Sequence, residues 1–218
     1  MLILWQKPQL ALTALSIPQP YNRPLNKHLP KKNKIIAEAG DFLSSVRIGI
    51  NADKYLDPGA LGCLGVGTPF GEGAYLACKD HFVGVLTGDG PFGFSTMELV
   101  TVVRHHIPIL IIVANNGSWA IEVRDQIENC GKAVGTTLQF SNYAELASSF
   151  GMFSIQVVNE NELESSVVFA IDKLPALLDL NVTPEAIPPD AKSGLAWVPV
   201  LQPLETWHKK EKKWRDHG

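Results

Sequence analysis

Two short polar motifs constrain the fold of this chain most, because each follows an apolar run of strand length. Gly88-Asp89-Gly90 follows residues 83–87, and Asn115-Asn116 follows residues 109–114. Continuous apolar runs of this length, bounded by turn-forming residues, are typical of strands that are buried on both faces of a parallel sheet. The two motifs are therefore expected at the carboxyl ends of two parallel strands.

The segment between the motifs has the right length to return the chain to the same edge of the sheet. Ser95 and Glu98 form a capping box that predicts a helix from Ser95 to His106, ahead of Pro108. About eleven helical residues rise about 16 Å, and the following strand returns about 20 Å. Asp89 and Asn116 should then lie side by side at the edge where open α/β sheets bind ligands.

Asp89 and Asn116 together would make an oxygen-only site of low charge. One carboxylate and one amide oxygen suit Mg²⁺ and leave coordination positions for phosphate oxygens and water. Taken singly, each residue is more often a turn former, but the pair at this spacing favours the metal. Cys63, Cys78 and Cys130 lack the spacing of a zinc site or of a disulfide framework.

A glycine-dense segment at residues 57–67 precedes these motifs and runs into an expected helix at residues 66–77. Backbone of this composition can approach a ligand closely. The segment lacks the leading strand and the downstream acidic residue of a dinucleotide fingerprint, and it lacks the Gly-Lys-Ser/Thr end of a P-loop. Taken alone, it leaves the identity of the ligand open.

Residues 86–122, with both polar motifs in this order, resemble the cofactor signature of thiamine diphosphate (ThDP) enzymes. Within that family, the segment resembles acetolactate synthase, benzaldehyde lyase and 2-hydroxyacyl-CoA lyase. The resemblance implies that Asp89, the side chain of Asn116 and the carbonyl of Ser118 bind Mg²⁺. It also implies that Gly88 and Gly90 lie with Asp89 against the cofactor's diphosphate, in a diphosphate-binding domain.

The same resemblance assigns roles in the glycine-dense segment. The carbonyl of Gly62 would accept a hydrogen bond from the cofactor's aminopyrimidine, and Leu64 would hold the cofactor in its bent shape. Core packing is the alternative for Leu64. Two residues depart from the family: Pro91 has no N–H to offer a phosphate, and Glu72 replaces a residue that is normally apolar.

Three residues are candidates to line the substrate end of the site, namely Asp41, Phe92 and Trp119, with packing or turn formation as the alternative for each. No catalytic residue is expected in this chain, because the family's essential glutamate belongs to a separate pyrimidine-binding domain. Glu38 follows a strand, but its surroundings match the entry strand of the diphosphate domain. The chain is therefore expected to be inactive without a pyrimidine-domain chain or a missing amino-terminal half.

Alternation of strands and helices predicts an α/β fold with a doubly wound, mainly parallel sheet and helices on both faces. The expected strands are 35–37, 83–87, 109–114, 154–158 and 176–181, and the expected helices are 66–77, 95–106, 143–150 and 162–171. Three regions are predicted: residues 1–33 as a short helix with a proline-rich linker, residues 34–183 as the ThDP-binding domain, and residues 184–218 as a tail with a helix at 204–214.

Composition narrows the function further. The chain has 218 residues, of which 45% are hydrophobic, and its net charge of −3 argues against a nucleic-acid partner. No segment is long and apolar enough to cross a membrane, and Lys7 and Pro8 interrupt the apolar start, so a signal peptide is not expected. Few, unpatterned cysteines favour the cytoplasm.

Three functions stay open at this point. The first is a Mg²⁺- and ThDP-dependent domain or subunit of an acetolactate synthase-like carboligase or decarboxylase that acts on 2-keto acids. The second is a relative of 2-hydroxyacyl-CoA lyase or oxalyl-CoA decarboxylase. The third is a non-catalytic domain that binds ThDP or mediates assembly. The two enzyme functions imply a homo- or hetero-oligomer.

Overall fold

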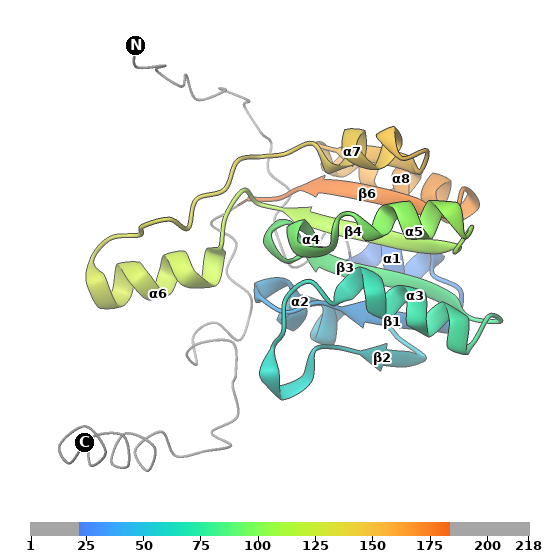
Figure 1. Ribbon diagram of the computed structural model, residues 1–218, viewed down its shortest axis with the longest axis horizontal. Coiled ribbons are helices and arrows are strands. Elements are labelled where there is room, and N and C mark those ends of the chain that lie inside the picture. Colours follow the sequence, from blue (N-terminus) through green and yellow to red (C-terminus); the bar gives the residue numbers. More distant parts are fainter. Residues whose placement is uncertain (1–21, 184–218) are drawn as a thin grey trace.

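The computed structural model describes residues 22–183, which form a six-stranded sheet between two layers of helices (Figure 1). All strand pairings are parallel, and the strand order is β2-β1-β3-β4-β6-β5. The strands are β1 Asn33–Ala37, β2 Lys54–Leu56, β3 Phe82–Gly88, β4 Ile109–Asn115, β5 Phe153–Val157 and β6 Ala176–Asn181. The predicted doubly wound parallel sheet is confirmed.

Helices cover both faces of this sheet. They are α1 Asn22–His28, α2 Asp41–Gly49, α3 Gly67–Ala77, α4 Asp89–Ser95, α5 Glu98–Arg104, α6 Ala120–Cys130, α7 Tyr143–Ser149 and α8 Glu160–Asp172. Helices α3, α5 and α7 lie on one face and α1, α2 and α8 on the other, whereas α6 projects away from the sheet (Figure 1). None of these described helices is long and apolar enough to cross a membrane.

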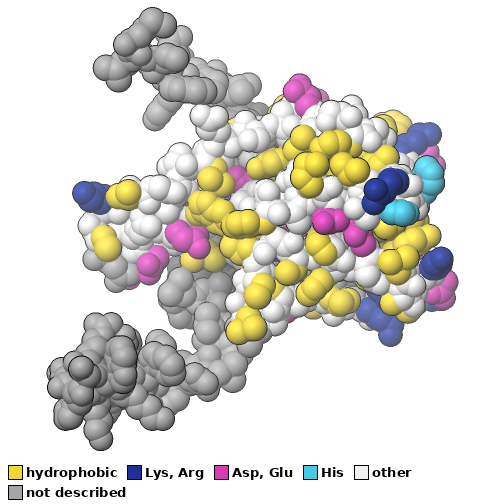
Figure 2. Space-filling view, viewed as in Figure 1, with side chains coloured by type: hydrophobic (Ala, Val, Ile, Leu, Met, Phe, Trp, Pro, Cys, Tyr) yellow, Lys and Arg dark blue, Asp and Glu magenta, His cyan; other side chains and the backbone are white. Residues whose placement is uncertain are grey.

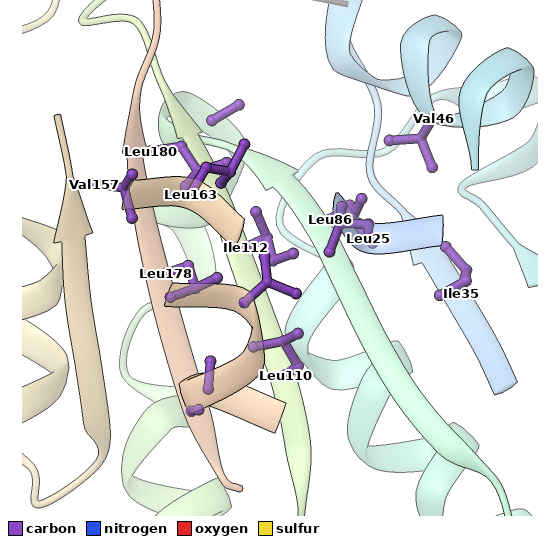
Figure 3. Close-up of a cluster of buried hydrophobic side chains, with 14 of the residues drawn as sticks. Leu25, Ile35, Val46, Leu86, Leu110, Ile112, Val157, Leu163, Leu178 and Leu180 are labelled. Atoms are coloured by element: carbon purple, nitrogen blue, oxygen red, sulfur yellow. The ribbon is translucent and has the colours of Figure 1, made fainter. Parts of the chain in front are cut away.

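Alternate residues of the central strands feed two separate hydrophobic clusters. In β4, Leu110 and Ile112 join the cluster under α1, α2 and α8, while Ile109 and Ile111 join the cluster under α3, α5 and α7. Successive side chains of a strand point to opposite faces, so a sheet covered on both faces requires the continuous apolar runs seen in the sequence. Figure 3 shows the first cluster, to which α1 contributes Leu25. The packed unit thus includes α1, ahead of the predicted start at residue 34.

One predicted helix differs from the structure. The chain becomes helical at Asp89, directly after β3, and residues 89–104 form two short helices instead of one helix from Ser95. The predicted capping box is wrong, because Met97 is the residue before α5 and no side chain caps that helix. Thr96 Oγ1 instead donates to the carbonyl of Phe92 at 2.9 Å. The helix therefore starts at Asp89, within the first polar motif.

Three elements were not expected from the sequence. Strand β2 lies at the sheet edge with all three residues exposed, so it has no buried face to generate an apolar pattern. Helices α2 and α6 were also missed, and α6 has no residue in either buried cluster among the described residues. The expected helix at 204–214 lies outside the described residues.

Candidate metal centre

The two polar motifs meet at the carboxyl edge of the sheet, as the spacing predicts. Strands β3 and β4 are neighbours, and Gly88 pairs with Ala114 near the end of both strands. Asp89 begins α4 directly after β3, and the backbone amides of Asn116 and Gly117 face its carboxylate as hydrogen-bond donors. Parallel pairing in this register therefore brings the two motifs into contact.

The Asp89 carboxylate lies in an environment that destabilises its charged form. Its side chain is buried, and Oδ2 has no hydrogen-bond partner within the described part of the chain. Burial raises the pKa of Asp89 to about 6, while the nearby backbone amides act in the opposite direction. A buried carboxylate oxygen without a donor is a site that a cation would stabilise.

Asn116 forms a tight turn beside this carboxylate. Its Oδ1 accepts a hydrogen bond from the amide of Ser118 at 2.9 Å, and the side chain is half-buried. Residues 136–138 brace the turn, because the amide of Trp119 donates to Thr136 O and Ser118 forms an antiparallel bridge with Thr137. The turn places an amide oxygen next to the predicted carboxylate ligand, while its own hydrogen bond holds the side chain in place.

Close neighbours favour glycine at position 90 of the first motif and at position 117, directly after the second. A Cβ at Gly90 would lie 2.6 Å from the ring of Trp119, which packs across this turn. Gly117 has a φ of +63°, and a Cβ there would lie 3.0 Å from the ring of Phe140. Pro91 is compatible with the turn, because it lies in the first turn of α4, where backbone N–H groups have no partner within the helix.

The glycine-dense segment forms a loop beside α4. Gly62 has a left-handed backbone at φ +57°, and a Cβ at Gly65 would lie 2.6 Å from Cβ of Phe94. Leu64 is 38% exposed and belongs to neither hydrophobic cluster of the described residues. Ordinary core packing therefore does not account for Leu64, and its assigned contact with a cofactor stays a prediction.

Glu38 is the residue whose role the sequence did not give. It is buried at the end of β1, where Oε1 accepts from the amide of Val66 at 2.6 Å and Oε2 accepts from Thr87 Oγ1 at 2.9 Å. A Cβ at Gly67 would lie 2.4 Å from the same carboxylate. Glu38 thus ties the glycine-dense loop to the end of β3. An acidic residue after a buried strand, at the point where the strand order reverses between β1 and β3, is the signal that could have revealed it.

The remaining candidates lie as follows. Phe92 has no exposed surface and packs edge-on against Tyr143, with ring centroids 5.3 Å apart, which is the packing alternative for this residue. Asp41 begins α2, and its side chain lies outside what the structure describes. Glu72 is half-buried on α3, and burial together with Glu98 raises the pKa of Glu72 to about 6.

Comparison with known proteins agrees with this geometry. The family model "Thiamine pyrophosphate enzyme, C-terminal TPP binding domain" matches residues 44–180, and therefore includes both polar motifs and the glycine-dense loop. The chain belongs to this family. The match also assigns the six-stranded sheet to the ThDP-binding fold and makes thiamine diphosphate the cofactor class of the site.

Relatives of two kinds are similar to this ThDP-binding chain. It is 36% identical to human 2-hydroxyacyl-CoA lyase 2 over 137 residues, which are 62% of this chain and 22% of that protein. It is 34% identical to acetolactate synthase large subunit IlvG of Mycobacterium tuberculosis over 169 residues, which are 74% of this chain and 30% of that protein. The chain therefore spans less than a third of the length of these relatives.

The residues present fit a divalent cation with a diphosphate. Among the residues that the structure describes, no three His, Cys, Asp or Glu side chains gather into a metal-binding group. A metal at this ThDP domain would rely on the free Oδ2 of Asp89, the amide oxygen of Asn116 and a backbone carbonyl such as that of Ser118. Few protein ligands, all of them oxygen, suit Mg²⁺ that keeps phosphate and water ligands.

Proposed function

We propose that this chain holds Mg²⁺ and the diphosphate of ThDP at the carboxyl ends of β3 and β4, as part of a larger enzyme that breaks or forms a C–C bond beside a carbonyl. One observation carries the proposal: Asp89 is a buried carboxylate with a bare oxygen, and it faces the Asn116 turn. The bound cofactor supplies the electron sink for the reaction. The chain's own residues bind and orient it.

The roles of these residues follow from their places in the fold. Asp89 Oδ2 and Asn116 Oδ1 would bind the cation, with the carbonyl of Ser118 as the third protein ligand. Glycine at position 90 keeps the backbone of the turn free of a side chain. The exposed loop of Gly62 and Leu64, which lies beside α4, would contact the cofactor's aminopyrimidine.

The exposed apolar residues around this site support a missing partner. Leu61 is 87% exposed, and Phe94 and Met97 are both 68% exposed, next to the glycine-dense loop and α4. Figure 2 shows apolar side chains spread over the face that carries α3 and α5. Apolar surface of this kind usually marks an interface. We place the pyrimidine-binding half or a partner chain over this surface, and expect no turnover by the 218-residue chain alone.

Two substrate classes follow from the relatives. A carboligase or decarboxylase for 2-keto acids is supported by the match to acetolactate synthase, which is the longer of the two. A lyase for 2-hydroxyacyl-CoA substrates is supported by the match to 2-hydroxyacyl-CoA lyase 2, which is the more identical. Assay of pyruvate and of a 2-hydroxyacyl-CoA, with a pyrimidine-domain chain added, separates these classes.

Titration calorimetry with ThDP tests the proposal. The full chain, mixed with a pyrimidine-domain chain, should bind ThDP in the presence of Mg²⁺ and lose this binding when EDTA removes the metal. Asp89→Asn should abolish the Mg²⁺-dependent part, while Asp172→Asn, which removes an exposed carboxylate from α8, should bind like wild type. Mg²⁺-independent binding, or equal binding by Asp89→Asn, would contradict the assignment. No binding by wild type would favour a non-catalytic assembly domain.

A further inference from the structure

A second buried carboxylate lies behind the metal-site loops. Asp179 stands in β6 with no exposed surface, and its neighbours in the sheet are Val113 of β4 and Gln156 of β5. The donors that reach its carboxylate include Asn115 Nδ2 at 3.1 Å, the amide of Tyr143 at 3.0 Å and Gln156 Nε2 at 3.4 Å. Asp179 is thus the acceptor of a buried hydrogen-bond network.

One branch of this network leads to the Asn116 turn. Asn115 is fully buried and directly precedes Asn116. Its Nδ2 donates both to Asp179 and to the carbonyl of Ser141 at 2.8 Å. The orientation of the last residue of β4, from which the turn starts, is therefore set by Asp179 together with the segment before α7.

The other branch leads to the Asp89 turn. Tyr143 is the first residue of α7, and its amide is held by Asp179. Its hydroxyl donates to the backbone carbonyl of Asp89 at 3.3 Å, and its ring packs edge-on against Phe92 of α4. Tyr143 thus connects the Asp179 carboxylate, through its backbone amide, to the turn that carries the predicted metal ligand, through its side chain.

We propose that Asp179 is a positioning residue, which fixes the Asp89 turn through Tyr143 and the Asn116 turn through Asn115 and so sets the separation of the two metal ligands. This inference rests on the proposed function. Its basis is that both branches end on the residues that would bind one cation. A carboxylate with two oxygens can direct two branches at once, which an apolar residue of similar size cannot do. Partners behind metal ligands commonly affect metal affinity by about 10- to 100-fold.

A purely structural role for Asp179 gives a different expectation. In that case, replacement would lower the stability of the fold, and the folded fraction would bind the cation as wild type does. Positioning through Tyr143 predicts weaker binding by folded protein. It also predicts that Asp179 and Tyr143 variants are not additive, because they remove two steps of one connection.

The test is a titration with Mn²⁺ as probe at saturating ThDP, using the full chain in the assembly in which wild type binds. Asp179→Asn should weaken Mn²⁺ binding by about tenfold and Tyr143→Phe by about threefold. The double variant should lose about tenfold, well short of the product of the two losses. Ser149→Ala is the matched control, because it removes a side-chain hydrogen bond to the carbonyl of Leu146 at the far end of α7.

The outcomes separate this inference from the proposed function. If Asp89→Asn abolishes Mn²⁺ binding but Asp179→Asn and Tyr143→Phe bind like wild type, the positioning role is overturned and the metal site stands. If the two losses multiply in the double variant, the connection through Tyr143 is overturned. If wild type itself binds no Mn²⁺ with ThDP, the proposed function fails and this inference fails with it. Tyr143→Phe keeps the test valid if Asp179→Asn does not fold.

Discussion

Asp89, which directly follows β3, and Asp179, which lies within β6, are two buried aspartates with different hydrogen-bond partners. Burial raises the pKa of each to about 6. Hydrogen-bond donors reach both oxygens of Asp179, namely Asn115 at Oδ1 and the Tyr143 amide and Gln156 at Oδ2, whereas Oδ2 of Asp89 has none among the described residues. Burial and pKa alone therefore do not distinguish a structural carboxylate from a binding one. The two are distinguished by the oxygen without a hydrogen-bond donor, because only Asp89 would gain a partner when a cation binds.

Replacement of Asp89 should give the largest effect on binding. Asp89→Asn keeps the shape of the side chain but removes the charge that a divalent cation requires, so Mg²⁺-dependent ThDP affinity should fall by at least about 100-fold. The measurement is calorimetry at pH 8, with the pyrimidine-domain chain present. If the ThDP affinity of Asp89→Asn stays within a few-fold of wild type, Asp89 is not a metal ligand and does not differ in role from Asp179.

A third buried carboxylate extends the comparison, since Glu38 has a partner on each oxygen as Asp179 does. Glu38→Ala leaves the amide of Val66 and the hydroxyl of Thr87 without this acceptor, so the free energy of unfolding should fall by about 3 kcal/mol. Glu38→Gln retains a carbonyl oxygen for Val66 and should lose less. Urea unfolding measures both variants. Equal stability of Glu38→Ala and wild type would show that the two hydrogen bonds of Glu38 do not stabilise the fold.

The pH dependence of stability should differ between wild type and Asp89→Asn. Because the folded-state pKa of Asp89 is raised, its contribution is fully present below the unfolded pKa of about 3.9 and is lost as the pH rises through about 6. Without ligand, the two proteins should be similar near pH 4, and the variant should be more stable by about 2–3 kcal/mol at pH 8. Parallel pH profiles would mean that the Asp89 carboxylate is solvated.

Asp179→Asn should have a smaller effect of opposite sign at pH 8. The raised pKa of Asp179 favours a neutral side chain here as it does at Asp89. The new amide group, however, points an N–H at one of the groups that donate to the carboxylate and leaves that donor unpaired, and we expect this cost to be the larger, so the free energy of unfolding should fall by about 1 kcal/mol. The measurement is thermal unfolding of Asp89→Asn and Asp179→Asn at pH 8, each compared with wild type. A gain in stability as large as that of Asp89→Asn would show that the donors around Asp179 contribute little.

The sequence predicted the parts of the fold that depend on local pattern. Strands β3 and β4 have apolar runs because both of their faces are covered, and the proximity of Asp89 and Asn116 followed from element lengths. The helix start was missed because Gly88-Asp89-Gly90-Pro91 has turn composition, although Pro91 is acceptable in a first helical turn. Edge strand β2 was missed because all three of its residues are exposed in the described part of the chain, so that no buried face generates a pattern.

The network behind the site could not be predicted from sequence. Asp179 reaches Asn115 only because β6 lies beside β4, an order that requires β5 to lie outside β6. Tyr143 reaches Asp89 from α7, which is distant in the chain. Likewise, Glu38 follows β1 and accepts hydrogen bonds from Val66 and from Thr87, and Thr87 lies in the neighbouring strand β3. Contacts of this kind depend on which strands become neighbours, and no local pattern encodes that choice.

The position of a bound metal ion shows directly whether Asp89 and Asn116 are metal ligands. Crystals of the chain with its pyrimidine-domain partner, ThDP and Mn²⁺ would locate the metal by anomalous scattering. We expect one peak in direct coordination contact with Asp89 Oδ2 and Asn116 Oδ1, next to the cofactor's diphosphate. A peak at any other place in the chain, or bound ThDP with no metal at Asp89, would contradict it.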